Sequence, residues 1–177
     1  IGHDNRGIDT TAEEEPGNQM AGFDLRIVSP WRTIPAALYG QMIGEDEANG
    51  MPTKYLALFG AEAWHGLENG ALLRAVVEYA NTTCSWQRSK PRFDCAYIQT
   101  IFNHEGYRYR GHPIGHGYDN DAAVWSGMLL YSRPNGISWH LTVQSGHINH
   151  RGFPGAPRNT TNTVSPARAR LQAARVE

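Results

Sequence analysis

The feature that most constrains the fold is a hairpin pattern in residues 122–144, AAVWSGMLLYSRPNGISWHLTVQ. Apolar and polar side chains alternate strictly along its second arm, residues 137–144, and the first arm places Trp125, Leu129 and Tyr131 on one face. Asn135 and Gly136 lie between the arms, and such a pair accommodates the positive φ angles of a tight turn. Alternation with period two around a short turn predicts a β-hairpin. The pattern leaves open whether the apolar face meets a protein core or lipid.

Similar alternation recurs along the chain. We predict strands at residues 19–29, 34–43, 55–64 and 71–80, a weaker pair at 96–102 and 106–110, and a last strand from residue 167. Residues 1–18 are polar and predict a loop. Many short strands with turn residues between them predict an all-β antiparallel fold.

The connections between these strands alternate in length. Residues 30–33, 65–70 and 132–136 are short, whereas residues 44–54, 81–121 and 145–162 are long. In outer-membrane barrels the periplasmic turns are short and the outside loops are long. The alternation therefore favours an up-and-down transmembrane β-barrel, with the long connections outside.

Two further patterns agree with a barrel. Charged residues occur within strands on the non-apolar faces, where a wet lumen would let opposite charges pair across strands. They are Asp24, Arg26, Glu62, Arg74, Glu78, Arg168 and Arg170. Aromatic residues near the short turns fit a girdle at one membrane interface. They are Trp31, Trp64, Tyr131 and Trp139. A soluble antiparallel sandwich would alternate as well, so on patterning both folds stay open.

Composition excludes some classes. The formal net charge of the 177 residues is −1, which gives no electrostatic case for binding nucleic acid. No apolar run approaches ~20 residues, so no transmembrane helix is predicted, although barrel strands leave a much weaker hydropathy signal. The sequence begins without an initiator Met or a signal peptide, and we expect a fragment of a longer protein.

Several motifs are more specific than the patterning. They are YGQ at 39–41, GEDE at 44–47, EYA at 78–80, YRYRG at 107–111 and IGH at 114–116. The opening PGNQMAGFDLR at 16–26 and the later SGHINHRG at 145–152 add to them. Together these motifs resemble the capsule assembly Wzi family, in the family's order and over almost the whole chain.

The resemblance implies a Gram-negative outer-membrane β-barrel of about eighteen strands that attaches or organises capsular or exported polysaccharide at the cell surface. Residues 1–177 would form a single partial barrel domain, the later part of the barrel, without its N-terminal part and its closing strands. The implied partners are the polysaccharide, outer-membrane lipid and the barrel-assembly machinery, with no nucleic acid, no cofactor and no enzymatic activity.

Loop residues are the candidates for polysaccharide contacts. Aromatic rings pack on the apolar C–H face of a sugar, and arginines and acids bond its hydroxyls or carboxylates. The candidates are Glu45, Asp46, Glu47, Trp86, Arg88, Tyr107, Arg108, Tyr109, Arg110, His116, Asp119 and Asp121. Alternating Tyr and Arg in residues 107–110 would equally suit a strand with a polar face. No metal site is predicted, because Pro113 and Gly115 exclude a helix that would align His112 with His116.

Cys84 and Cys95 are the two cysteines, and both fall in the longest connection. An oxidising cell surface predicts a disulfide, which would stabilise the protein by roughly 2–3 kcal/mol. A cytosolic pair of free thiols is the rival interpretation.

Three functional classes remain. The first is a non-enzymatic outer-membrane barrel that binds polysaccharide at its outer loops. The second is a soluble carbohydrate-active enzyme that uses Glu45, Asp46 or Glu47 as paired catalytic carboxylates. The third is a secreted β-sandwich that acts as a lectin or a structural module.

Overall fold

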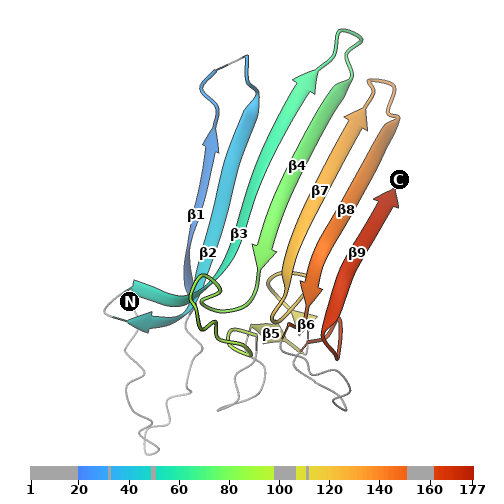
Figure 1. Ribbon diagram of the computed structural model, residues 1–177. Coiled ribbons are helices and arrows are strands. Elements are labelled where there is room, and N and C mark those ends of the chain that lie inside the picture. Colours follow the sequence, from blue (N-terminus) through green and yellow to red (C-terminus); the bar gives the residue numbers. More distant parts are fainter. Residues whose placement is uncertain (1–19, 32, 49–50, 98–106, 111, 151–161) are drawn as a thin grey trace, which may run out of the picture.

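The computed structural model describes residues 20–31, 33–48, 51–97, 107–110, 112–150 and 162–177. Seven strands in these residues form one antiparallel sheet, in the order β1-β2-β3-β4-β7-β8-β9 (Figure 1). They are β1 (Ala21–Val28), β2 (Ala36–Ala48), β3 (Met51–Gly66), β4 (Leu72–Asn81), β7 (Ala123–Ser132), β8 (Ser138–Ile148) and β9 (Ala169–Val176). A separate short ladder joins β5 (Arg108–Tyr109) to β6 (His112–Pro113). The spatial order follows the chain order, so the predicted up-and-down arrangement is confirmed for these strands.

The predicted long loop at residues 44–54 is wrong. β2 continues to Ala48 and β3 begins at Met51, with Asp46 opposite Thr53 and Ala48 opposite Met51. Figure 1 shows this extension as a bent ribbon that leaves the sheet at the lower left. Gly, Asp and Asn disfavour strands on average, but an antiparallel ladder that has already formed can continue through them.

Two other boundaries differ from expectation. β8 reaches Ile148, beyond the predicted loop boundary at residue 144. β5 (Arg108–Tyr109) lies within the strand predicted at 106–110 but is only two residues long, and Ala96 and Tyr97 form a turn and not the start of a strand. Residues 98–106 lie outside the described part, so the rest of the strand predicted at 96–102 stays a prediction. In the central turn only Gly136 has a positive φ, 87°, and Asn135 does not. Gly136 donates its N–H to the Arg133 carbonyl at 3.1 Å, as in a turn followed by a glycine bulge.

One face of the sheet is apolar and exposed. The register places Leu25 opposite Gly40 and Leu129 opposite Leu141. The outward face therefore carries the odd-numbered residues of β1, β3, β4, β7 and β8 and the even-numbered residues of β2. Leu25 and Leu38 are each 62% exposed and Trp125 is 58% exposed. Within the described residues no second sheet of comparable size covers them. A sandwich would bury such a face against its partner sheet, whereas a barrel turns it toward lipid.

The opposite, inward face is polar. Glu62 on β3 is only 6% exposed and accepts hydrogen bonds from the guanidinium groups of Arg26 on β1 and Arg74 on β4. Tyr39 donates its hydroxyl to Glu78 at 3.1 Å, across Gly60. The predicted pairing of opposite charges across strands is therefore present on the inward face.

Two predicted face assignments are wrong. Trp64 lies opposite Arg74 on the inward face, so it does not join Trp31 and Trp139 in a girdle. Arg170 lies opposite His147, on the outward face near the loop end, and not on the polar face. Trp64 faces inward because alternation within β3 places it on the same face as Glu62. The faces of the last strand are reversed relative to expectation, since one residue more or less in a connection reverses which face a side chain occupies. Among the described residues, no helix is long and apolar enough to cross a membrane.

Candidate functional site

A layer of loops closes the lower end of the sheet in Figure 1. We call residues 82–97, 107–122 and 162–168 the loop layer. Its first segment is closed by a disulfide between Cys84 and Cys95, so the predicted disulfide is confirmed. Cys84 is buried with Ala96 and Tyr97 against Leu56 of β3. The loop layer thus starts from a small core on the inward side of the sheet.

A buried ion pair within residues 107–122 is also bonded to the segment 162–168. Arg108 donates to both carboxylate oxygens of Asp119, at 2.7 and 2.8 Å from Nη2 and 3.1 Å from Nε. Thr163 adds its backbone N–H at 2.7 Å and its hydroxyl at 2.8 Å to Oδ2 of Asp119. The side chain of Asp119 is fully buried and that of Arg108 is 6% exposed. Charge and hydrogen bonding together compensate the loss of hydration of this carboxylate.

Side-chain amides and hydroxyls extend the same network. Thr82 donates its hydroxyl to the Asp119 carbonyl at 2.6 Å and accepts the Ala122 N–H at 2.8 Å. Asn162 donates to the carbonyls of Tyr118 and Asn120, at 3.0 and 2.6 Å. These bonds join segments about forty positions apart in the chain. The loop layer is therefore held as one unit over the strand ends.

Several backbone positions in this network have left-handed φ angles without glycine. They are Ser85, Asp94, Asp119, Asp121 and Asn149, with φ between 50° and 60°. Asp and Asn adopt this region more readily than other residues, because their short polar side chains bond the local backbone. The acidic and amide residues of the loops are thus needed for backbone shape as well as for hydrogen bonding.

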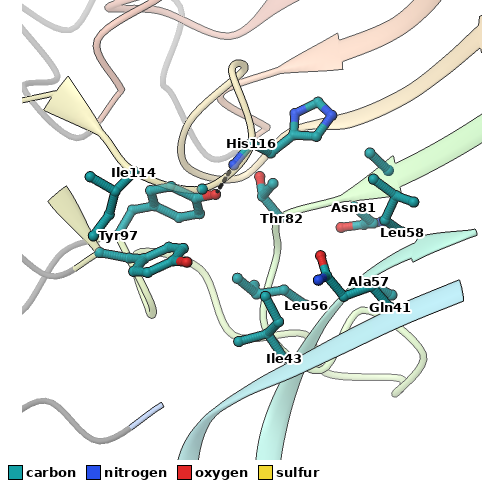
Figure 2. Close-up of a pocket in the computed structure, with 13 residues that line it drawn as sticks. Gln41, Ile43, Leu56, Ala57, Leu58, Asn81, Thr82, Tyr97, Ile114 and His116 are labelled. Atoms are coloured by element: carbon teal, nitrogen blue, oxygen red, sulfur yellow. Dashed lines mark hydrogen bonds between the residues drawn. The ribbon is translucent and has the colours of Figure 1, made fainter. Parts of the chain in front are cut away.

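A pocket of about 320 Å³ lies between the loop layer and the ends of β2, β3 and β4 (Figure 2). It is lined by Gln41, Ile43, Leu56, Ala57, Leu58, Ala80, Asn81, Thr82, Tyr97, Tyr107, Ile114, Gly115 and His116. The described lining residues include neither Arg, Lys, Asp nor Glu. The pocket combines apolar surface with neutral hydrogen-bonding groups, as small-ligand sites do.

The two tyrosines of the pocket are held rigidly. Tyr97 accepts the backbone N–H of His116 at 2.8 Å (Figure 2). Its ring meets the Tyr107 ring edge-on, with the ring centres 5.7 Å apart. A side chain at Gly115 would come within 2.4 Å of the Tyr97 hydroxyl and 2.5 Å of Cε1 of Tyr107. Glycine is therefore required at position 115 for the loop to approach both rings.

Burial sets the protonation states at the pocket. Burial raises the pKa of Tyr97 to about 12, so this phenol stays neutral. Burial also lowers the pKa of His116 below 6.5, so its imidazole is neutral at pH 7. The Tyr118 N–H donates to Nδ1 of His116 at 3.3 Å, which leaves the proton on Nε2. His116 can therefore act as an uncharged hydrogen-bond donor.

Among the sequence-predicted contact residues whose side chains the structure describes, Tyr107 and His116 line this pocket. Arg108 and Asp119 bond one another below the surface, and Asp121 is buried and accepts the Asp94 N–H at 3.0 Å. Their ligand roles stay predictions.

The other predicted contact residues lie outside the pocket. Tyr109 is 64% exposed beneath Arg110, whose guanidinium carbon lies 5.4 Å from the ring centre. Trp86 packs on Phe59 and Tyr79, which are outward-facing residues, and Arg88 is exposed two positions further along. The side chains of Glu45, Asp46 and Glu47 lie outside the described part, on the β2 extension. Within the described residues no three His, Cys, Asp or Glu side chains could share a metal ion.

Sequence analysis proposed neither Gln41 nor Tyr97 as a polysaccharide contact. Gln41 belongs to the YGQ motif and is an exposed residue of β2. No hydrogen bond is found for its amide within the part of the chain that the structure describes, whereas Asn81 and Thr82 bond the surrounding scaffold. A polar residue between Gly40 and Met42 is ordinary in an alternating strand, so the pattern gave no reason to choose Gln41. Its place in the YGQ motif was the signal that could have pointed to it.

Comparison with known proteins agrees with this architecture. The family model for the capsule assembly protein Wzi matches residues 1–169. The chain belongs to the Wzi family. A 55.8 kDa protein of the cps region of Klebsiella pneumoniae, itself uncharacterised, is 32% identical over 149 residues, which are 84% of this chain and 28% of that protein. The chain therefore spans less than a third of this relative.

A solved Wzi structure from Escherichia coli also matches, with a TM-score of 0.67 and 26% identity, over 86% of this chain and 33% of that one. That protein is described as an outer-membrane protein involved in group 1 capsule assembly and as a carbohydrate-binding β-barrel. The predicted Wzi resemblance and outer-membrane location are confirmed. The antiparallel sheet of this chain matches part of the E. coli Wzi barrel. The count of about eighteen strands stays a prediction.

Proposed function

We propose that this part of the Wzi-family barrel binds capsular or exported polysaccharide at its loop end and helps to hold the polymer at the cell surface. The observation that carries the proposal is the pocket under Tyr97 and Tyr107, which joins aromatic surface to uncharged hydrogen-bonding groups. The carbohydrate binding described for the E. coli relative supports it.

The pocket chemistry suits one sugar unit of a polymer. Tyrosine rings offer flat apolar surface for the C–H face of a pyranose, while the Gln41 amide can both donate to and accept from hydroxyls. The volume of about 320 Å³ lies at the lower end of small-ligand pockets, so it suits a single ring better than a longer segment. Because the described lining has no ionisable acid or base that is charged at pH 7, we infer an uncharged sugar unit.

We infer binding and not bond cleavage. A glycosidase needs two carboxyl groups about 5–10 Å apart around the scissile bond, and the described pocket lining contains none. Contacts at many repeats of a polymer would add by avidity, so each pocket need bind only weakly. β1 and β9 each have one neighbour in the described sheet, and we propose that further strands of the whole protein extend it into a barrel. Lipid would cover the outward face, and the barrel-assembly machinery would insert it.

The test is binding of a short oligosaccharide of the polymer's repeat to the intact protein in detergent, which removes avidity. We expect Tyr107→Ala and Gln41→Ala each to weaken binding about five- to tenfold, the effect of losing one stacking surface or hydrogen bond. Tyr131→Ala is the matched control, because Tyr131 lies at the short-turn end beside Arg133. Unchanged affinity in both pocket variants, with the protein folded, would remove the pocket as a sugar site.

The orientation is a second expectation. We predict that the loop layer faces outside and that the turns at residues 67–71 and 133–137 face the periplasm. Single cysteines can replace Gly117 in the loop layer and Glu68 in the turn, because both positions are exposed and the native cysteines are bonded to each other. An impermeant maleimide on whole cells should label the cysteine at position 117 only. Labelling of the cysteine at position 68 alone would show the opposite orientation and contradict this prediction.

A further inference from the structure

The disulfide-closed loop carries a concentrated positive charge. The disulfide closes residues 84–95, which contain Arg88, Lys90 and Arg92 and one acid, Asp94, whose carboxylate accepts a hydrogen bond from the Asn120 amide at 2.8 Å. All three cations are exposed, and none forms an ion pair within the part of the chain that the structure describes. The Arg92 N–H bonds the Cys84 carbonyl at 2.8 Å beside the disulfide, so both ends of the loop are fastened. The charges are thus presented on a closed loop and not on a free tail.

The same loop crosses the rim of the sheet. It begins on the inward side, where Cys84 packs on Leu56. Two residues later Trp86 meets Phe59 and Tyr79 edge-on, with ring centres 6.3 and 6.1 Å apart. Phe59 and Tyr79 share the outward face with Trp125. The ring centres of Trp125 and Tyr79 are 4.8 Å apart. These four aromatic residues form a cluster on the outward side.

The cluster lies where β4 ends and β7 begins. Tyr79 lies two residues before the end of β4, and Trp125 lies two residues after the start of β7. Trp and Tyr in membrane barrels concentrate where the apolar band meets the head groups. Basic residues adjacent to that level are attracted to lipid phosphates, by about fivefold in binding constant for each cation.

We propose that the loop of residues 84–92 binds the phosphate groups of the lipid leaflet at the loop end of the barrel, with Trp86 in the head-group layer and Arg88, Lys90 and Arg92 on the phosphates. An acidic polysaccharide could also pair with these cations. Lipid is favoured because Trp86 places the loop on the outward side, whereas the proposed sugar pocket lies on the inward side of the same rim. The inference goes beyond polysaccharide binding and does not require it.

The test uses the intact protein in detergent micelles that contain diphosphorylated lipid A, compared with lipid A from which both phosphates have been removed. We expect the protein to bind the phosphorylated form more tightly. The triple variant Arg88→Gln, Lys90→Gln, Arg92→Gln should lose about a hundredfold of that affinity, and each single variant about fivefold. The double variant Arg88→Gln, Lys90→Gln should lose about twenty-five-fold, whereas a charge-matched double variant outside the loop layer, Arg133→Gln, Arg175→Gln, should bind lipid A like the parent.

A second readout tests the depth of the loop independently of its charge. Lipids brominated near the head group should quench tryptophan fluorescence of the parent more than that of Trp86→Phe, and lipids brominated near the chain end should not distinguish the two. Equal loss of lipid A affinity in both double variants would overturn the proposal. So would loss of binding to an acidic polysaccharide with lipid A binding intact, which would assign the cations to the polymer.

Discussion

Replacing Arg108 with alanine will destabilise the loop layer by about 3–5 kcal/mol, because the Asp119 carboxylate would stay buried after losing its guanidinium partner. Thr163 would remain as a donor, but two neutral hydrogen bonds do not replace a positive charge in a buried site. Arg108→Lys should destabilise the loop layer less than Arg108→Ala does, because an ammonium keeps the charge but loses the paired geometry of the guanidinium.

Hydrogen exchange of the intact protein in detergent would measure this effect. The amides of Thr163 and Ala122 bond directly to the network, so their protection should fall, while the strands keep theirs. Arg110→Ala is the control, since Arg110 is an exposed arginine two positions away that stacks on Tyr109, and it should cost less than about 0.5 kcal/mol. Equal protection in the Arg108 and Arg110 variants would mean that the buried pair does not hold the loop layer.

Gly146→Ala should be the most damaging of the strand glycine substitutions compared below. A Cβ at position 146 of β8 would lie 2.2 Å from the Ala123 carbonyl oxygen and 2.7 Å from the Val124 Cα. Both are backbone atoms of the neighbouring strand, so no side-chain rotation relieves the overlap. We expect a loss of about 1–3 kcal/mol in unfolding free energy, the range for overpacked interiors.

Two other glycines make this prediction specific. At Gly60 the new Cβ would meet the Tyr39 ring at 2.1 Å, but that ring can turn away at the expense of its hydrogen bond to Glu78, about 1 kcal/mol. Gly66 has nothing within 4 Å, so alanine there should be neutral or slightly stabilising. Urea unfolding of the three alanine variants in detergent should therefore show the largest loss of unfolding free energy at Gly146, a smaller loss at Gly60 and the smallest at Gly66. A Gly146 variant as stable as the Gly66 variant would contradict the close approach of β7 and β8.

The alternating pattern was sufficient to predict where the seven long strands lie and, for β1, which residues share each face. Phe23, Leu25 and Ile27 alternate with Asp24 and Arg26, and the structure places these two sets on opposite sides of β1. Local geometry determines this outcome, because successive side chains of a strand must point to opposite faces. The two cysteines in one long connection likewise predicted their disulfide. These are properties of short stretches of chain.

Only the tertiary structure decided which loop residues meet. The sequence predicted that Arg108 and Asp119 contact a ligand. In the structure the chain folds back between them, and the two side chains, 11 residues apart, form a buried ion pair. The sequence made Trp86 a candidate sugar contact like Tyr107, but the loop carries Trp86 over the rim to the outward side, away from the pocket. Gln41 and Tyr97 border one pocket although no local pattern connects them. Alternation determines which way a side chain points only where the backbone is a strand. In the loops that follow Asn81, long-range packing and buried hydrogen bonds determine the side-chain directions instead.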